Sequence, residues 1–348
     1  MTINELPTIK ISVVAPPHSG KTTLITLLYE YLTKIKVSDD TFAVSCTKNK
    51  YRLDDYLSQI RNNKEVPKSL IDGLEFEFEF TIQTSSRTIS QKIVILDADG
   101  EMINNWNGGC GVYEKGKPAL RKYRQHLHES QILLLPIDMP VIIEDDSPHF
   151  IKSSSALNYE NIKAIVAEWQ SYRKESNENC IAHLVVTKCE TYYSRENAKI
   201  QECEKKVHSC FASILTEMYK AQNISIHYTP VFTSGFNVFN KEMSQWKQIG
   251  NTKFQYEEVF DNNSKRVKPF GINDIWNSIF DHMTFNMSNH LKMELSNQSF
   301  VSFGTDETKE IAIKAIDFFM KIMELKTENI NDNFNYNKIL KPRWKKNT

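Results

Sequence analysis

The segment that most constrains the fold of this chain is residues 15–22, which read Ala-Pro-Pro-His-Ser-Gly-Lys-Thr. It follows the apolar, β-branched run Ile9–Val14 and precedes the amphipathic stretch Thr22–Lys36, so the order is strand, loop, helix. Gly-Lys-Thr at a helix start is the Walker A pattern, in which backbone N–H groups and the helix N-terminus surround phosphates. Ala15 stands where the pattern normally has its first glycine. The residues expected to contact a nucleotide are Pro17, His18, Ser19, Gly20, Lys21, Thr22 and Thr23.

Two of these residues have predicted chemical roles. Lys21 is expected to reach the β- and γ-phosphates and to act in catalysis, and the Thr22 hydroxyl is expected to ligate Mg²⁺. Pro17 and His18 stiffen and crowd the loop near the γ-phosphate, which predicts slow intrinsic turnover.

A second apolar strand, Lys92–Asp97, ends in an aspartate that is followed by Gly100 and Glu101. An apolar strand with a terminal aspartate is the Walker B pattern, whose carboxylate holds Mg²⁺. In the D-x-x-G form, the glycine N–H contacts the γ-phosphate. We therefore expect Asp97 on the metal and Gly100 at the phosphate. Glu101 is either the residue that positions the attacking water or an ordinary loop residue.

The nucleobase is predicted to lie against two later loops. Thr187-Lys188-Cys189-Glu190 follows the apolar run Ile181–Thr187 and resembles the guanine-reading N/T-K-x-D motif, with Glu in place of Asp. A carboxylate at Glu190 accepts hydrogen bonds from guanine N1–H and N2–H₂, which adenine cannot supply. Thr233 and Ser234 end the next strand-like run, Ile224–Phe232, and are expected to meet guanine O6.

Strand-like and helix-like segments alternate over the first 235 residues, which predicts an α/β domain with a mostly parallel sheet flanked by helices. Glu75–Gln83 differs because phenylalanines alternate with glutamates, which predicts a half-exposed antiparallel strand at a sheet edge. The remaining strand is predicted at Gln131–Ile137 and the remaining helices at Tyr51–Asn62, Tyr159–Lys174 and Glu196–Ala221.

After Gly235 the pattern changes. The polar stretch at residues 237–267 predicts a long loop or insertion, and helical spacing from Ile272 to Met283 predicts a helix that packs on the sheet. A second amphipathic stretch, Glu307–Leu325, predicts a helical appendage. The predicted organisation is a GTPase domain at residues 1–286 and a helical extension with a basic tail at 287–348.

The four motifs lie in order over residues 10–235 and resemble the translation-factor-related class of P-loop GTPases. More narrowly, the chain resembles the bacterial double-GTPase type of G domain of conflict and defence systems. That likeness includes the helix around Tyr56–Ile60, the segment Val66–Ser69, the Asp-x-x-Gly-Glu form of the third motif, and Val267–Phe270 near the end. The chain has one Walker A segment, so the resemblance implies at most one member of a pair.

The resemblance also implies that Ser69 is the switch I hydroxyl that ligates Mg²⁺. Spacing from Lys21, as in small GTPases, favours Thr41 instead, and Thr47 is a third candidate. No arginine can be assigned as a catalytic finger.

The amino-acid composition disfavours two classes of function. Lys+Arg and Asp+Glu both number 43, which disfavours a nucleic-acid binder and a charge-held membrane protein. Six cysteines without a C-x-x-C pair, and no signal peptide at the first ten residues, predict a cytoplasmic protein. The predicted function is GTP hydrolysis with Mg²⁺ and a conformational switch, with GTP or GDP and a protein effector, such as a second GTPase, as partners. The alternatives are a P-loop ATPase or kinase, and a pseudo-GTPase that holds nucleotide without turnover.

Overall fold

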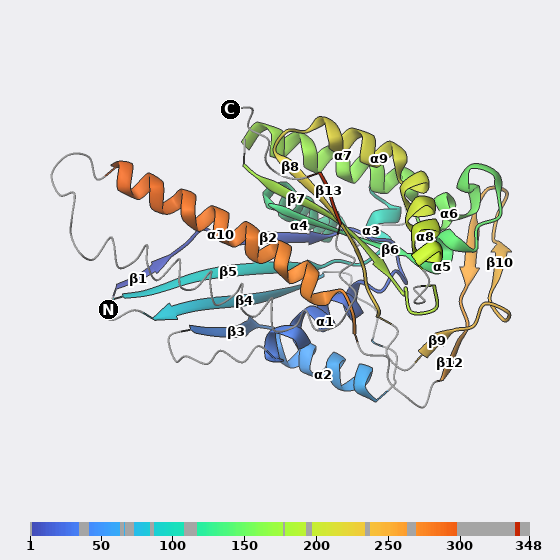
Figure 1. The fold of residues 1–348 in the computed structure, drawn as a ribbon, viewed down its shortest axis with the longest axis horizontal. Coiled ribbons are helices and arrows are strands. Elements are labelled where there is room, and N and C mark those ends of the chain that lie inside the picture. The colour runs from blue at the N-terminus through green and yellow to red at the C-terminus, as the bar shows by residue number, and fades with distance from the viewer. Residues whose placement is uncertain are drawn as a thin grey trace.

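The computed structural model describes residues 2–34, 42–62, 66, 73–83, 87–107, 117–176, 178–192, 197–233, 237–262, 269–297 and 338–341. Within these ranges a nine-stranded sheet has helices on both faces (Figure 1). β1 (Thr2–Glu5) pairs in parallel with the first half of β5. The other strands follow in the order β13 (Lys338–Lys341), β8 (Ile224–Pro230), β7 (Cys180–Thr187), β6 (Ile132–Asp138), β2 (Ile9–Val13), β5 (Arg87–Asp97), β4 (Leu74–Gln83) and β3 (Phe42–Lys48).

The centre of the sheet, from β8 through β7, β6 and β2 to β5, is parallel. Every residue of β6, β7 and β8 is buried, because helices cover both faces. This explains why these strands appear in the sequence as continuous apolar runs. The predicted α/β class with a mostly parallel sheet is confirmed, and the carboxyl ends of β2, β5, β6, β7 and β8 lie along one edge.

The strand predicted at Glu75–Gln83 is antiparallel to β5, as expected, but its predicted place at the edge is wrong. β3 pairs on its outer side, with Val44 opposite Phe80. β3 escaped prediction because its short sequence mixes apolar and polar residues, and its alternate side chains Ala43, Ser45 and Thr47 are exposed.

One face of the sheet is covered by α1 (Lys21–Lys34), α2 (Lys50–Arg61) and α10 (Ile272–Asn297). The Trp276 indole donates to the Leu28 carbonyl over 2.9 Å and meets the Phe78 ring edge to face, with centroids 6.3 Å apart. The expectation that the helix after residue 272 packs on the sheet is therefore confirmed, and that helix continues to Asn297. The predicted helix at 307–325 lies outside the described residues, and the boundary at residue 286 stays a prediction.

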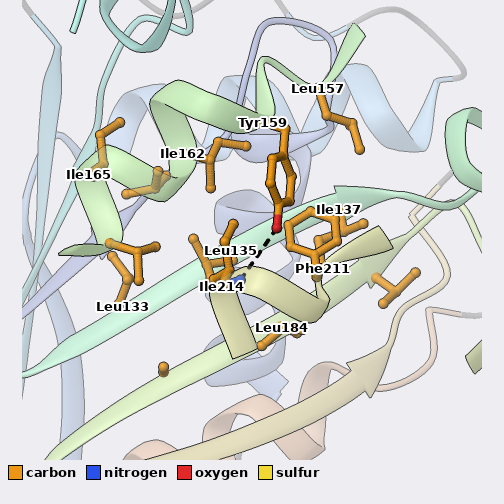
Figure 2. Close-up of a cluster of buried hydrophobic side chains, with 14 of the residues drawn as sticks. Leu133, Leu135, Ile137, Leu157, Tyr159, Ile162, Ile165, Leu184, Phe211 and Ile214 are labelled. Atoms are coloured by element: carbon orange, nitrogen blue, oxygen red, sulfur yellow. Dashed lines mark hydrogen bonds between the residues drawn. The ribbon is translucent and has the colours of Figure 1, made fainter. Parts of the chain in front are cut away.

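The opposite face carries α4 (Lys117–Glu129), α7 (Tyr159–Ser176), α8 (Asn197–Cys210) and α9 (Ala212–Lys220). Figure 2 shows side chains of α7 and α9 packed on the apolar side chains of β6 and β7. The single helix predicted at Glu196–Ala221 is wrong, because the chain turns at Phe211. That ring is 1% exposed and meets Tyr159 edge to face. The Tyr159 hydroxyl accepts the Ile214 N–H at 3.3 Å, so it satisfies a first-turn donor of α9.

Of the two expectations for residues 237–267, the long loop is wrong for the described part, 237–262, which we name the ribbon lobe, and the insertion stays a prediction. It contains two antiparallel ribbons: β9 (Asn237–Phe239) with β12 (Phe260–Asn262), and β10 (Gln245–Gln248) with β11 (Phe254–Glu257). Aromatic side chains that are spread through the polar sequence form its small core, in which Phe239 packs on Tyr256 and Tyr192. The lobe lies beside α5 (Met139–Ile143) and α6 (Ile151–Ala156) (Figure 1).

Candidate nucleotide-binding site

The predicted phosphate loop connects β2 to α1 and contains two residues with left-handed backbone, His18 (φ 64°) and Gly20 (φ 81°). The Ser19 hydroxyl donates to the Pro16 carbonyl at 2.8 Å and fixes the turn between them. Left-handed residues within such a loop turn successive N–H groups toward one side, which is the geometry of anion-binding backbone concavities. The loop ends at the N-terminus of α1, whose dipole also favours an anion.

Lys21 is buried, with 6% of its surface exposed, and its amine donates to the Pro16 carbonyl at 3.3 Å. Burial lowers the pKa of Lys21, while the negative charges of Asp97, Asp99 and Glu101 oppose that shift. An anionic ligand would favour the charged form of Lys21, because phosphate charge offsets the desolvation of the ammonium group.

Thr22 and Asp97 meet directly below the loop. The Thr22 hydroxyl donates to Asp97 Oδ2 at 2.9 Å, and the two residues are 9% and 1% exposed. A hydroxyl and a carboxylate are the hard oxygen donors that Mg²⁺ accepts, and Mg²⁺ commonly combines one or two such side chains with phosphate oxygens and water. The residues present therefore fit a Mg²⁺–nucleotide complex. Across the described ranges, no group of three or more His, Cys, Asp or Glu side chains is arranged to hold a metal.

Gly100 packs against the phosphate loop from the end of β5. A Cβ at this position would lie 2.4 Å from the Pro17 nitrogen and 2.7 Å from its Cα, so no larger residue fits without displacing backbone. The next residue, Glu101, starts the short helix α3 (Glu101–Asn104). Its exposed carboxylate accepts a hydrogen bond from the Asn104 amide at 2.8 Å.

The loop after β7 is tied to the phosphate loop by Thr187. Its buried hydroxyl lies 3.1 Å from the Ser19 carbonyl and 3.2 Å from the Ile137 carbonyl. Lys188 has left-handed backbone (φ 58°), and its N–H donates to the Thr233 hydroxyl at 3.1 Å. The structure thus brings together the loops after β7 and β8, which sequence analysis proposed for the base.

The Lys188 amine is held by two carboxylates that sequence analysis missed. Asp138, at the end of β6, and Glu258, in the ribbon lobe, both accept hydrogen bonds from Lys188 Nζ. Asp138 had a usable signal, because it is a polar residue at the carboxyl end of a buried strand. Glu258 had none, because it lies in a polar stretch that carries no motif.

The remaining predicted site residues divide into those outside the described part of the chain and those placed on its surface or half-buried. Ser69, Thr41 and Ser234 lie outside the described residues. Thr47 is exposed on β3, and its hydroxyl donates to the Glu77 carboxylate at 2.7 Å. Glu190 is half-buried two residues after Lys188, and Thr23 is half-buried in the first turn of α1.

The parallel sheet, the phosphate loop after its first central strand, the Thr22–Asp97 pair and the lysine loop after β7 together define a P-loop G domain. A family model described as Double-GTPase 2 matches residues 9–234, and the chain belongs to this family, whose description is that of a GTP-binding G domain. The match begins with β2 and reaches Ser234, so it spans the sequence motifs analysed above. The comparison with curated proteins gave no match. In the part of the chain that the structure describes, no helix is both long and apolar enough to cross a membrane.

Proposed function

We propose that this G domain hydrolyses GTP with Mg²⁺ and uses the bound nucleotide as a conformational switch. The observation that supports this most is the contact between Thr22 and Asp97 beside the buried Lys21. A metal–phosphate complex requires a hydroxyl and a carboxylate donor, and this contact aligns them before any ligand arrives. Little reorganisation is therefore needed on binding.

In this proposal, the chain contributes mainly positioning and charge. Mg²⁺, when bound, would neutralise phosphate charge and polarise the transferred group. Lys21 binds the β- and γ-phosphates, Thr22 and Asp97 orient the metal, and the backbone of residues 17–20 surrounds the phosphates. Gly100 senses the γ-phosphate because it lies against Pro17, so a group that enters beside this contact displaces the start of α3.

Glu101 is the proposed residue for positioning water, and its present geometry supports slow intrinsic turnover. Its carboxylate is engaged by Asn104, so it has to leave that hydrogen bond before it orients a water. The same contact favours the second candidate function, a module that holds guanine nucleotide without turnover.

We also propose a partner and a cellular role for the protein. A second G domain is the proposed partner, because this sequence has one Walker A segment and its family is described as a double GTPase. The resemblance to G domains of bacterial conflict systems supports a cytoplasmic role in defence.

Nucleotide-dependent melting and phosphate release test the proposal together. GTP and GDP with Mg²⁺ are expected to raise the melting temperature more than ATP and ADP do. At a free concentration 100 times its Kd, a guanine nucleotide should add about 2.7 kcal/mol to the free energy of unfolding. Phosphate release from GTP then separates the enzyme from the module that only binds. Equal stabilisation by adenine and guanine nucleotides contradicts the proposal.

A further inference from the structure

The Lys188 amine lies in a cluster with more acid than base. Asp138 and Glu258 both bind it, and the three side chains are 11%, 6% and 12% exposed for Lys188, Asp138 and Glu258. The Phe260 ring lies 5.8 Å from Nζ and covers another side of the ammonium. Two buried carboxylates thus share one cation at the loop that the proposed function assigns to the base.

Each of the two carboxylates has one buried oxygen that accepts no hydrogen bond. Asp138 Oδ1 and Glu258 Oε1 have no hydrogen-bond partner among the described residues. Burial, followed by the charge of Asp138 and a hydrogen bond with it, raises the pKa of Glu258 to about 8, while Lys188 opposes this shift. Buried acceptors without donors are costly, so this cluster favours a ligand that brings N–H or O–H groups.

The ribbon lobe holds Glu258 in this place. The next residue, Val259, is fixed on both sides: its N–H donates to the Ser244 hydroxyl at 2.9 Å and its carbonyl accepts the Asn240 N–H at 2.8 Å. The lobe itself is anchored to the G domain, because the Trp246 indole donates to the Glu144 carbonyl at 2.8 Å. A side chain fixed this way is pre-organised for a ligand.

We propose that Glu258 is a specificity-determining residue of the nucleotide site, and that the ribbon lobe is therefore part of that site. Glu258 holds Lys188 in position through one oxygen and accepts an N–H or O–H donor of the guanine nucleoside through the other. This inference rests on the proposed function, since it requires that Lys188 lies at the nucleoside.

Calorimetric titration of the full chain with Mg²⁺–GDP, with wild type compared to Glu258→Ala and Glu258→Gln, tests the proposal. Glu258→Ala is expected to weaken GDP binding by about tenfold or more, and Glu258→Gln by less, because it keeps an acceptor oxygen. The matched control is Glu257→Ala, which removes an exposed ion pair with Lys247 (2.6 Å) in the same ribbon and is expected to leave affinity unchanged.

Analogues then identify the donor. IDP lacks the exocyclic amine of guanine, 2′,3′-dideoxy-GDP lacks both ribose hydroxyls, and ADP lacks the guanine N1–H. The effect of Glu258→Ala is therefore expected to disappear for whichever nucleotide lacks the group that Glu258 binds. In steady-state hydrolysis, KM for GTP should rise while kcat stays unchanged, because Glu258 contacts the base-reading lysine and not Lys21 or Thr22.

Two results overturn the inference while leaving the proposed function intact: unchanged GDP affinity in Glu258→Ala, or an equal loss for GDP, IDP, 2′,3′-dideoxy-GDP and ADP, which means that the residue only supports the lobe. A wild-type protein that binds GDP no better than ADP overturns the proposed function, and the inference with it.

Discussion

The two ends of the proposed nucleotide site are built in different ways. The phosphate end uses one continuous loop, with Lys21 and Thr22, and the end of the neighbouring strand, with Asp97 and Gly100. The base end draws Lys188, Thr233, Asp138 and Glu258 from four segments that are far apart in the sequence. In the proposed site, phosphate recognition would depend on local backbone geometry, whereas base recognition would depend on tertiary packing and on the ribbon lobe. Thr187 connects the two ends through the Ser19 carbonyl.

The largest effect is expected at the phosphate end, from Lys21→Ala. Loss of the ammonium should reduce GTP affinity or turnover by about a hundredfold or more, since one charge-stabilising donor typically contributes about 10²–10³ in rate. The melting temperature of the free protein should change little, because burial already lowers the pKa of Lys21 and so opposes its charge. Nucleotide titration and phosphate release measure the effect.

The matched control is Lys34→Ala, which removes a lysine with a 61% exposed side chain from the last turn of the same helix. This variant should bind and turn over GTP like wild type. Wild-type affinity and turnover in Lys21→Ala would contradict the assignment of the phosphate loop.

At the base end, Glu190→Ala should weaken GTP binding by about tenfold to a hundredfold, because hydrogen bonds to charged groups contribute roughly 1.5–3 kcal/mol. ATP affinity should stay the same, since adenine lacks the N1–H and N2–H₂ donors that guanine presents to this carboxylate. Glu190→Asp should keep the preference for guanine. If the GTP titrations of wild type and Glu190→Ala overlay, base recognition rests on Lys188, Thr233 and Glu258 instead.

Gly100→Ala tests the contact between the phosphate loop and the segment that follows β5. The added methyl group would lie 2.4 Å from the Pro17 nitrogen, so the variant should lose about 1–3 kcal/mol of stability, as overpacked sites do. Gly250→Ala is the control, because its methyl group would lie at an ordinary 3.7 Å from Lys253. Urea denaturation measures both, and equal stability of the two variants would show that the loops separate without cost.

The same contrast explains how far the sequence predicted the molecule. The central strands and the phosphate end were predicted because β-branched runs and Gly-Lys-Thr act through local geometry. β3 and the ribbon lobe were missed, because their strands are short and polar and exist through pairing with distant partners. Glu258 is the clearest case: its relation to Lys188 spans 70 residues and appears only when the lobe is folded. The break at Phe211 was missed for the same reason, since Tyr159 from another helix stabilises it.

The smallest expected effect is a dependence of stability on pH. It arises from buried histidines beside the strands that support the two ends of the site. His183, on β7, lies 2.7 Å from the Thr229 hydroxyl of β8 and 3.1 Å from the Ser278 hydroxyl of α10. Burial, with the nearby His227, lowers the pKa of His183 well below its usual value. His126, on α4, donates to the Ile11 carbonyl of β2 at 3.0 Å, and burial lowers its pKa too. His183 thus supports the base end and His126 the phosphate end.

Because the pKa of each of these histidines is lower in the folded than in the unfolded chain, the unfolded state binds more protons once the pH falls below about 6.5. The stability that these histidines contribute is therefore fully present above pH 6.5. The free energy of unfolding decreases on acidification, with a slope of at most about 1.4 kcal/mol per pH unit for each histidine. Urea denaturation at pH 7.5 and 5.5 should show a loss of about 1–2 kcal/mol from these two groups. His183→Gln should reduce that loss more than His126→Gln, since the pKa of His183 is shifted further, and the exposed His149→Gln should leave it unchanged. An identical loss in all three variants would mean that acid acts through other groups, and that neither His183 nor His126 contributes through its neutral form.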